Sequence, residues 1–469
     1  MSAQTAEDFI PYKQTNLRLP SVPLLVNDPY FSIWSNYDAL NAGPTRMWCE
    51  HEKAIEGILR VDGTSYRFMG IGQQNLLKPI AGMTLDGDMW KGKVNYDPQN
   101  GTNWAQQNFN DGAWKEETAA WGTPGEYPNV TNPWTGENKD IYVRRTVKLN
   151  PADLDKDLWI QFSHDDIFEL YINGTQVIGT GETWKQGEQH QLTAEQKKLL
   201  KSGDNVIAAH CHNTAGGAYI DFGLYENIME EGPAVLNAKQ YNVDVLATSS
   251  YYNFTCGPVN LDLVFTAPML IDDPDLISTP INFISYQVKS NDGKKHDVQF
   301  YLGTTPQLTV NEMNQPTVST TEDHNGVKYA KAGSKDQNYL GRSGDMISID
   351  WGYLYIPAVN GEVSVCPSEK AESYFINTGK LPENSSTPLE STGRANMPTL
   401  CFVNDLGNIS DYRNFMMIGY DEVWDMQYMK QNYKAYYARN GKTIFQAFDE
   451  FKKDYESLMK SCKDLDKMI

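Results

Sequence analysis

Short runs in which apolar and polar residues alternate dominate the chain from about residue 140 to residue 360. The runs are rich in β-branched and aromatic residues and are bounded by Gly, Asn, Asp and Pro, a pattern that predicts half-buried strands. The expected strands are Ile141–Leu149, Leu158–Phe162, Phe168–Ile172, Val206–His210, Tyr241–Thr248, Leu261–Phe265, Ile281–Val288 and Val298–Leu302. Strands at this spacing indicate antiparallel β-sandwiches, so the expected fold class is mainly β.

Two segments between predicted strands carry the residues that tight turns require. Asn173 and Gly174 predict a hairpin turn, since both residue types tolerate a positive φ. Ser290–Lys294, which contains Asn, Asp and Gly, predicts a second hairpin between the strands at 281–288 and 298–302.

The pattern changes near the C-terminus, where apolar residues recur at alternating steps of four and three. These positions are Ile444, Phe448, Phe451, Tyr455, Leu458, Cys462 and Leu465. Such spacing places them on one face of a helix, and Thr443 and Gln446 fit a capping box at its start. The apolar face either packs back on the sandwiches or awaits a further domain.

Length and charge narrow the functional classes. The 469 residues are enough for two to four domains. Sixty acidic against 40 basic side chains give a net charge of −20, which would repel nucleic acid and anionic membrane surfaces. No run approaches the roughly 18 apolar residues of a membrane span. We therefore expect neither a nucleic-acid partner nor a membrane span.

The N-terminus and the cysteines bear on the cellular compartment. Ser2–Gln4 has the small-residue character that follows a signal-peptidase cut, so we interpret Met1 as an expression start on an exported periplasmic, cell-surface or extracellular protein. The six cysteines show no Cys-x-x-Cys spacing, which argues against a zinc site or a thioredoxin-like motif. Buried free thiols are the favoured interpretation, and disulfides are the alternative.

The block from Trp90 to Glu226 forms a unit in its pattern. Its characteristic segments are Phe109–Trp114, Tyr142–Thr146, Asp165–Gly174 and Leu200–Ile207. In this order they resemble the galactose-binding-like jelly roll that precedes catalytic domains in β-galactosidase-type glycoside hydrolases. The resemblance implies a fold; ligand binding does not follow from it, because many such modules are structural.

Segments on both sides of this block resemble a second family. They are Leu19–Ser35, Gly43–Arg46, Arg60–Gly70, Phe265–Leu270, Asp292–Asp297, Asp350–Tyr355 and Tyr420–Met429. In this order they resemble the N-terminal and central regions of the glutaminase A family. In that family the segment like Arg60–Gly70 leads almost directly into the segment like Tyr241–Thr248. The resemblance therefore implies a jelly roll inserted into a larger, discontinuous β-sandwich.

The two resemblances together suggest a division of the chain. The expected parts are a flexible tail at 1–16 after a removed signal peptide, a first sandwich part at 17–88, the inserted jelly roll at 89–227, a second sandwich part at 234–415 and a helical segment at 420–469. Family members continue past this region into a helical toroid that is thought to hold the active site. The resemblance thus implies glutamine hydrolysis by a complete protein, with this chain alone inactive and the missing helical domain as its partner.

Aromatic residues in the inserted block are candidates for ligand binding. Trp104, Trp114 and Trp134, with Trp121 nearby, lie in predicted loops and would stack on the faces of a glycan. Packing at the rim of the jelly roll is the competing interpretation, and the sequence favours neither.

Carboxylates at the start of a predicted strand form another candidate. Asp165, Asp166 and Glu169 would grip sugar hydroxyls or a structural calcium ion, whereas solvated turn acids are the favoured alternative. His210 and His212 share one face of a strand, but no third metal ligand is identifiable. We expect no metal site and no cofactor, with structural calcium left open.

The densest group of acidic and aromatic residues outside the block is Asp421, Glu422, Trp424 and Asp425. These residues are candidates for a domain interface beside the toroid, and a connecting turn is the competing interpretation. No nucleophile motif or phosphate-binding loop occurs, so catalytic residues stay unassigned.

Two functional hypotheses follow. In the first, the chain is the non-catalytic N-terminal β region of an exported glutaminase-like hydrolase. In the alternative, it is a carbohydrate-binding β-sandwich protein or an accessory part of a glycoside hydrolase, with a glycan or another small molecule as ligand.

Overall fold

The computed structural model describes residues 6–49, 51–72, 75–125, 127, 129–134, 139–229, 233–312, 315–342, 347–392 and 397–469. The segment Ser2–Gln4, on which the expectation of a cleaved signal peptide rests, lies outside these residues. The predicted tail is anchored at Phe9, in the short helix η1 (Ala6–Phe9), because its ring is only 3% exposed.

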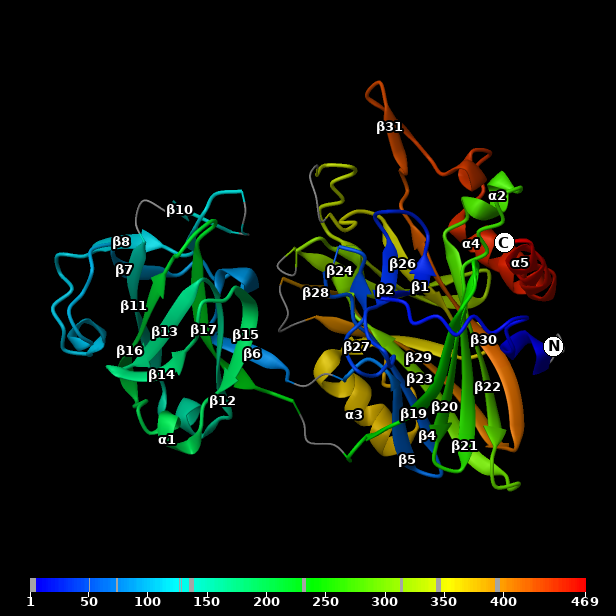
Figure 1. Ribbon diagram of the computed structural model, residues 1–469, viewed down its shortest axis with the longest axis horizontal. Coiled ribbons are helices and arrows are strands. Elements are labelled where there is room, and N and C mark those ends of the chain that lie inside the picture. Colours follow the sequence, from blue (N-terminus) through cyan, green and yellow to red (C-terminus); the bar gives the residue numbers. More distant parts are fainter. Residues whose placement is uncertain are drawn as a thin grey trace.

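Two facing sheets form the larger part of the molecule, on the right of Figure 1. Within the described residues, one sheet has the order β18 (Leu236–Asn237), β5 (Thr64–Met69), β4 (Ile55–Val61), β23 (His296–Thr304), β29 (Pro398–Ile409), β27 (Glu362–Pro367). The other has the order β19 (Lys239–Val245), β20 (Ser249–Cys256), β21 (Val259–Thr266), β22 (Ile281–Ser290), β30 (Asp411–Asp421), β26 (Tyr353–Pro357), β25 (Val327–Ser334), β24 (Thr317–His324), β28 (Leu389–Ser391). A small sheet of β1 (Val22–Val26), β2 (Ser32–Ser35) and β3 (Arg46–Met47) lies beside them. Strands from both ends of the chain therefore share one sandwich.

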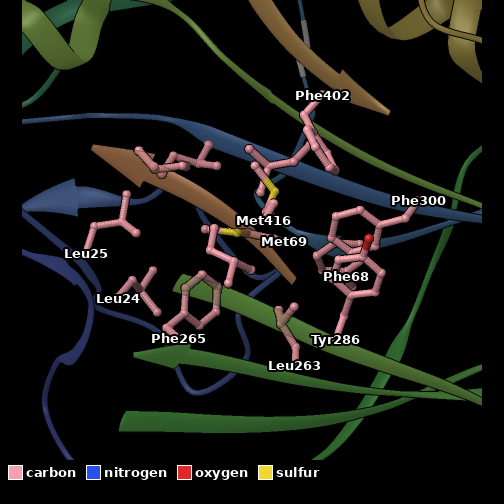
Figure 2. Packing of buried hydrophobic residues seen from close by; sticks show 14 of the residues in the cluster. Leu24, Leu25, Phe68, Met69, Leu263, Phe265, Tyr286, Phe300, Phe402 and Met416 are labelled. Atoms are coloured by element: carbon pink, nitrogen blue, oxygen red, sulfur yellow. The ribbon is translucent and has the colours of Figure 1, made fainter. Parts of the chain in front are cut away.

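The interior of this sandwich is built from the inward-facing residues of both sheets. Figure 2 shows Phe68, Tyr286 and Phe300 packed together there. The Tyr286 and Phe300 rings are stacked with centroids 4.2 Å apart. Strand β22 is buried on both faces, since Ile284 points into this core and Phe283 into a second cluster under the C-terminal helices. Its sequence accordingly reads as an almost continuous apolar run.

Residues 77–227 form two further sheets with a core of their own, on the left of Figure 1. In the described part of this block, one sheet contains β10 (Asn132–Pro133), β9 (Trp121–Gly122), β17 (Tyr219–Asn227), β12 (Leu158–Asp165), β15 (Lys185–Gln191) and β6 (Leu77–Ala81). The other contains β14 (Thr175–Gly179), β13 (Ile167–Ile172), β16 (Gly203–His212), β11 (Asp140–Leu149), β7 (Lys91–Asn95) and β8 (Lys115–Thr118). A one-turn helix α1 (Ala194–Lys197) precedes β16. The mainly β fold class with antiparallel sandwiches is confirmed.

The two predicted hairpins have different outcomes. Asn173 and Gly174, both with positive φ, connect the paired strands β13 and β14, so the first prediction is confirmed. The second is wrong, because the segment Ser290–Lys294 connects β22 to β23 in the opposite sheet. Both segments contain turn-forming residues, but β22 pairs along its edges with β21 and β30, while its two apolar faces are buried in the sandwich core and under the C-terminal helices.

The C-terminal region contains two helices, α4 (Ile444–Lys453) and α5 (Tyr455–Met468), where the sequence predicted one. Their shared apolar face packs back on the sheet. Phe415 and Tyr455 stack with centroids 4.0 Å apart, and the Tyr455 hydroxyl lies 2.7 Å from Ser285 Oγ. The face is thus covered by the sandwich.

The segment that precedes these helices is not helical, which corrects the predicted helical boundary at residue 420. Strand β30 runs to Asp421, and a hairpin of β31 (Met426–Tyr428) and β32 (Gln431–Tyr433) follows. A 3-10 turn, η7 (Tyr436–Ala438), then packs near the short helix α2 (Pro274–Ile277). The hairpin projects from the top of the molecule in Figure 1. The remaining longer helix, α3 (Ser368–Thr378), covers the outer side of the six-stranded sheet of the large sandwich.

The predicted cap of α4 is confirmed and has a measurable consequence. Thr443 Oγ1 accepts a hydrogen bond from Gln446 N, and the Gln446 side chain accepts one from Thr443 N at 2.9 Å. Thr443→Ala removes half of this reciprocal pair, and we expect it to lower the free energy of unfolding by about 1 kcal/mol. Urea unfolding followed by circular dichroism measures the change. Thr387→Ala, in an exposed loop, is the control, and an equal loss in both variants would contradict a specific cap.

Candidate functional site

Four carboxyl side chains meet at the end of the large sandwich that lies near the C-terminal helices. Asp28 follows β1, Asp421 ends β30, and Glu422 and Asp425 precede the hairpin. They line a pocket of about 140 Å³, the acid pocket. Asn27, Ile277, Ser278, Pro280 and Tyr437 complete its lining.

Asp28 and Glu422 are joined by a side-chain hydrogen bond, which requires a proton on one of the two carboxyl groups. Asp28 Oδ1 accepts hydrogen bonds from the backbone N–H groups of Tyr30, at 2.6 Å, and Phe31, at 3.1 Å. Burial and the bond to Asp28 raise the pKa of Glu422 far above its usual range, so Glu422 carries the proton of this bond.

The other two carboxyl groups are also shifted toward the neutral form. Burial raises the pKa of Asp425 to about 7, and the charges of Asp28 and Asp421 act in the same direction. Burial raises the pKa of Asp421, although Val423 N donates to its Oδ1 at 3.0 Å. The pocket thus contains the neutral carboxyl group of Glu422 beside Asp425, which titrates near neutral pH. A carboxyl group with such a pKa can act as a proton donor or acceptor.

The small volume of the acid pocket limits the size of the ligand that it can hold. Sites that enclose a small molecule have volumes of about 300–1,000 Å³, well above the 140 Å³ found here. Among its other polar groups, Ser278 Oγ accepts a hydrogen bond from Tyr437 N and Asn27 Oδ1 accepts one from Asn282 Nδ2, whereas the buried Asn27 Nδ2 has no partner among the described residues. The pocket therefore fits one small polar group at a time.

The hairpin β31–β32 stands beside the acid pocket and exposes large apolar side chains. Their exposed fractions are 56% for Met426, 59% for Tyr428, 80% for Met429 and 41% for Tyr433. Neighbouring exposed apolar side chains of this kind mark interaction surfaces.

The sequence singled out Asp421, Glu422, Trp424 and Asp425, and the structure places all of them except Trp424 in the pocket. Trp424 lies next to it, where its carbonyl accepts a hydrogen bond from Trp351 Nε1 at 3.1 Å. Asp28 was missed, because nearly 400 residues separate it from Glu422. An Asp-Pro pair directly after an apolar strand was the available signal.

The tryptophans of the inserted block do not form an exposed platform. Trp104, Trp114 and Trp134 are 3%, 8% and 1% exposed. Trp104 packs edge-on against Tyr142 and Tyr171 at 5.0 and 5.3 Å. The structure thus supports the packing interpretation, because a buried ring cannot stack on a sugar.

The carboxylates of the block are bound to protein donors. Asp166 Oδ2 accepts from Thr214 N and Oγ1 at 2.8 and 2.6 Å, and Glu169 accepts from the Tyr171 hydroxyl at 3.0 Å. Asp165 accepts from the hydroxyl of Tyr127. No group of three or more His, Cys, Asp or Glu side chains in the described residues is arranged to hold a metal ion.

The histidines and cysteines have structural surroundings. His210 and His212 both contact Asp140 Oδ1, at 2.8 and 3.0 Å. All six cysteines are buried and free, which confirms the favoured interpretation. No helix in the described ranges is long and apolar enough to cross a membrane.

Comparisons with known proteins give partial similarities. One family model, "Domain of unknown function (DUF5127)", matches residues 248–469, and another, "Domain of unknown function (DUF4964)", matches residues 2–82. Glutaminase A of Aspergillus oryzae (strain ATCC 42149 / RIB 40) is 24% identical over 272 residues, covering 54% of this chain and 38% of that protein. The chain therefore spans well under half the length of this curated relative.

Solved structures with partial similarity are glycoside hydrolases. A glycosyl hydrolase family 2 member from Bacteroides cellulosilyticus DSM 14838 has 9% identity and a TM-score of 0.24, covering 46% of this chain and 33% of its own. A β-glucuronidase from Ruminococcus gnavus has 11% identity and a TM-score of 0.25, covering 74% and 45%. Scores this low carry no argument about function. The glutaminase similarity supports a hydrolase-like protein.

Proposed function

We propose that this chain is the non-catalytic N-terminal β region of an exported glutaminase-like hydrolase, whose complete form converts L-glutamine to L-glutamate and ammonia. The observation that carries the proposal is the acid pocket, which has acid–base groups but too little volume to enclose a substrate. A second wall is needed to complete such a site. The similarity to glutaminase A, of which this chain covers 38%, supports a helical catalytic part of the same protein as that wall.

The hairpin β31–β32 supports the same assignment. It places four large apolar side chains in solvent directly beside the carboxyl groups. Burying them against a helical domain would stabilise the contact by the usual hydrophobic effect. We also propose the division at 17–88, 89–227 and 234–415, with the middle part inserted as a jelly roll.

Ammonia release from L-glutamine tests the proposal. We expect activity from the product of the gene extended past Ile469 and none from the 469-residue chain, because the acid pocket alone is too small to enclose a substrate and lacks a second wall. Ammonia release by the 469-residue chain alone would refute the assignment. A folded extended protein that releases no ammonia from L-glutamine would also refute it. Cell fractionation of the native host tests export, and a purely cytoplasmic protein would contradict it.

A hairpin variant tests the docking surface in the extended protein. Tyr428→Ser with Met429→Ser removes exposed apolar area, and we expect at least about tenfold slower ammonia release because the domains separate. The control Tyr241→Ser removes a ring that is 55% exposed on β19. Equal rates in both variants would contradict the proposed contact.

A further inference from the structure

A crevice of about 370 Å³ lies where the two parts of the molecule meet. The large sandwich contributes residues of β4, β23 and α3, and the block 77–227 contributes Gln161 and Gln189 from β12 and β15. Its volume is within the range of small-molecule sites, which occur preferentially at such junctions.

The charges that face this crevice are unequal in number. Arg67 Nη1 donates to Glu56 Oε2 at 2.7 Å, and Nη2 of the same guanidinium donates to Glu372 Oε1. Both glutamates line the crevice, and Glu52 lies at its exposed edge. Two carboxylates therefore share one guanidinium, which leaves one negative charge without a matching positive charge.

Each of these glutamates also keeps an acceptor oxygen available. Glu56 Oε2 takes both the Arg67 bond and a bond from Gly72 N at 2.8 Å. For Glu56 Oε1 and Glu372 Oε2, no hydrogen-bond partner is found among the described residues. Burial, together with the charge of Glu372, raises the pKa of Glu56 to about 8 although Arg67 lowers it. Protonation of Glu56 thus neutralises the unmatched negative charge when no ligand is bound.

The remaining lining suits a compact polar molecule. Asn75 Nδ2 donates to Gln189 Oε1 at 3.2 Å, so a pair of amides forms one wall. Leu76, Leu77 and Met397 supply an apolar surface. A ligand with a charged amino group and a polar body matches both surfaces.

We propose that the crevice binds a small polar molecule with a primary ammonium group, which contacts the free oxygens of Glu56 and Glu372. An amino sugar and an amino acid share this chemistry. The proposal is independent of the function assigned above, since no residue of the acid pocket takes part.

Isothermal titration calorimetry of the full 469-residue chain at pH 6.5 tests the site. D-Glucosamine, L-glutamine and the neutral sugar D-glucose are titrated in two buffers of different ionisation enthalpy. We expect at least one amine to bind, D-glucose to bind at least about tenfold more weakly, and binding to release a proton as Glu56 ionises. Binding of glucosamine alone assigns an amino sugar, and binding of glutamine alone assigns an amino acid. Failure of both amines, equal binding of glucose, or no proton release would overturn the proposal.

Two variants separate the charge from the shape of the crevice. Glu372→Gln leaves Arg67 paired one-to-one with Glu56, so amine affinity falls at least about tenfold and proton release disappears. Ile71→Trp narrows the rim at a position that is 37% exposed, and it lowers affinity without changing charge. The matched control Glu322→Gln loses a half-buried ion pair to Lys331 outside the crevice and keeps full affinity. Unchanged affinity in a folded Glu372→Gln or Ile71→Trp protein would refute the site.

Discussion

Replacing Arg67 by Met lowers the free energy of unfolding by about 3 kcal/mol at pH 7, because the substitution leaves two buried carboxyl groups without their shared cation. The side chains of Arg67, Glu56 and Glu372 are 8%, 17% and 12% exposed, so water replaces little of the lost interaction. The carboxyl groups can take up protons instead, which keeps the loss at the lower end of the usual range for a broken buried pair. Urea unfolding monitored by tryptophan fluorescence measures the difference.

An exposed arginine supplies the control for this measurement. Arg18 pairs with Asp38 at 2.7 Å, but the two side chains are 81% and 69% exposed. Arg18→Met should therefore change stability far less than Arg67→Met, because water screens an exposed ion pair. Adding Glu372→Gln to Arg67→Met should recover part of the loss, since the two residues interact directly. A similar small loss in both arginine variants would show that the shared guanidinium does not hold α3 against β5.

The stability of the protein should fall as the pH rises from about 4 to about 7, because the folded acid pocket retains protons that the unfolded chain releases. The pKa of Asp425 rises from 3.8 to about 7 on folding. The stability that comes from keeping Asp425 protonated is fully present below pH 3.8. It is lost as the pH rises through about 7, where the folded protein must also release this proton. This difference corresponds to about 4 kcal/mol, and partial exposure reduces the expected effect to about 2 kcal/mol.

Asp425→Asn isolates this effect. The variant should be more stable than the parent protein by about 2 kcal/mol at pH 8 and nearly equal to it at pH 4, because the amide carries no charge at either pH. Urea midpoints at both pH values measure the change. Equal offsets at pH 4 and pH 8 would contradict a buried carboxyl group with a raised pKa.

Asp292 is a control whose pKa is shifted in the opposite direction to that of Asp425. Hydrogen bonds from His296 and from the backbone of Lys294 lower its pKa to about 2. Its contribution is present above pH 3.8 and is lost as the pH falls through about 2. Asp292→Asn should therefore be destabilising at pH 8, the reverse of the effect at Asp425.

The residues in these predictions differ in whether the sequence alone could identify them as site residues. Asp421 and Glu422 lie in a dense acidic and aromatic segment, so the sequence marked them as candidates. Asp28 enters the acid pocket only because β1 packs beside the large sheets and brings its end to the end of β30. Glu56, Arg67 and Glu372 carry no local motif, and the crevice that they line exists only where two separately built sandwiches meet.

Local patterns alone indicated the eight strands named from the sequence, the Asn173–Gly174 turn and the Thr443 cap, because alternation, turn conformation and capping depend on residues a few positions apart. The tertiary structure decided which strands share a sheet, as the Ser290–Lys294 segment shows by joining opposite sheets. It also decided that the tryptophans of the inserted block pack inside and that the C-terminal helices lie on β22 and β30. These outcomes depend on burying apolar faces and pairing charges between residues hundreds of positions apart, and no local pattern specifies such contacts.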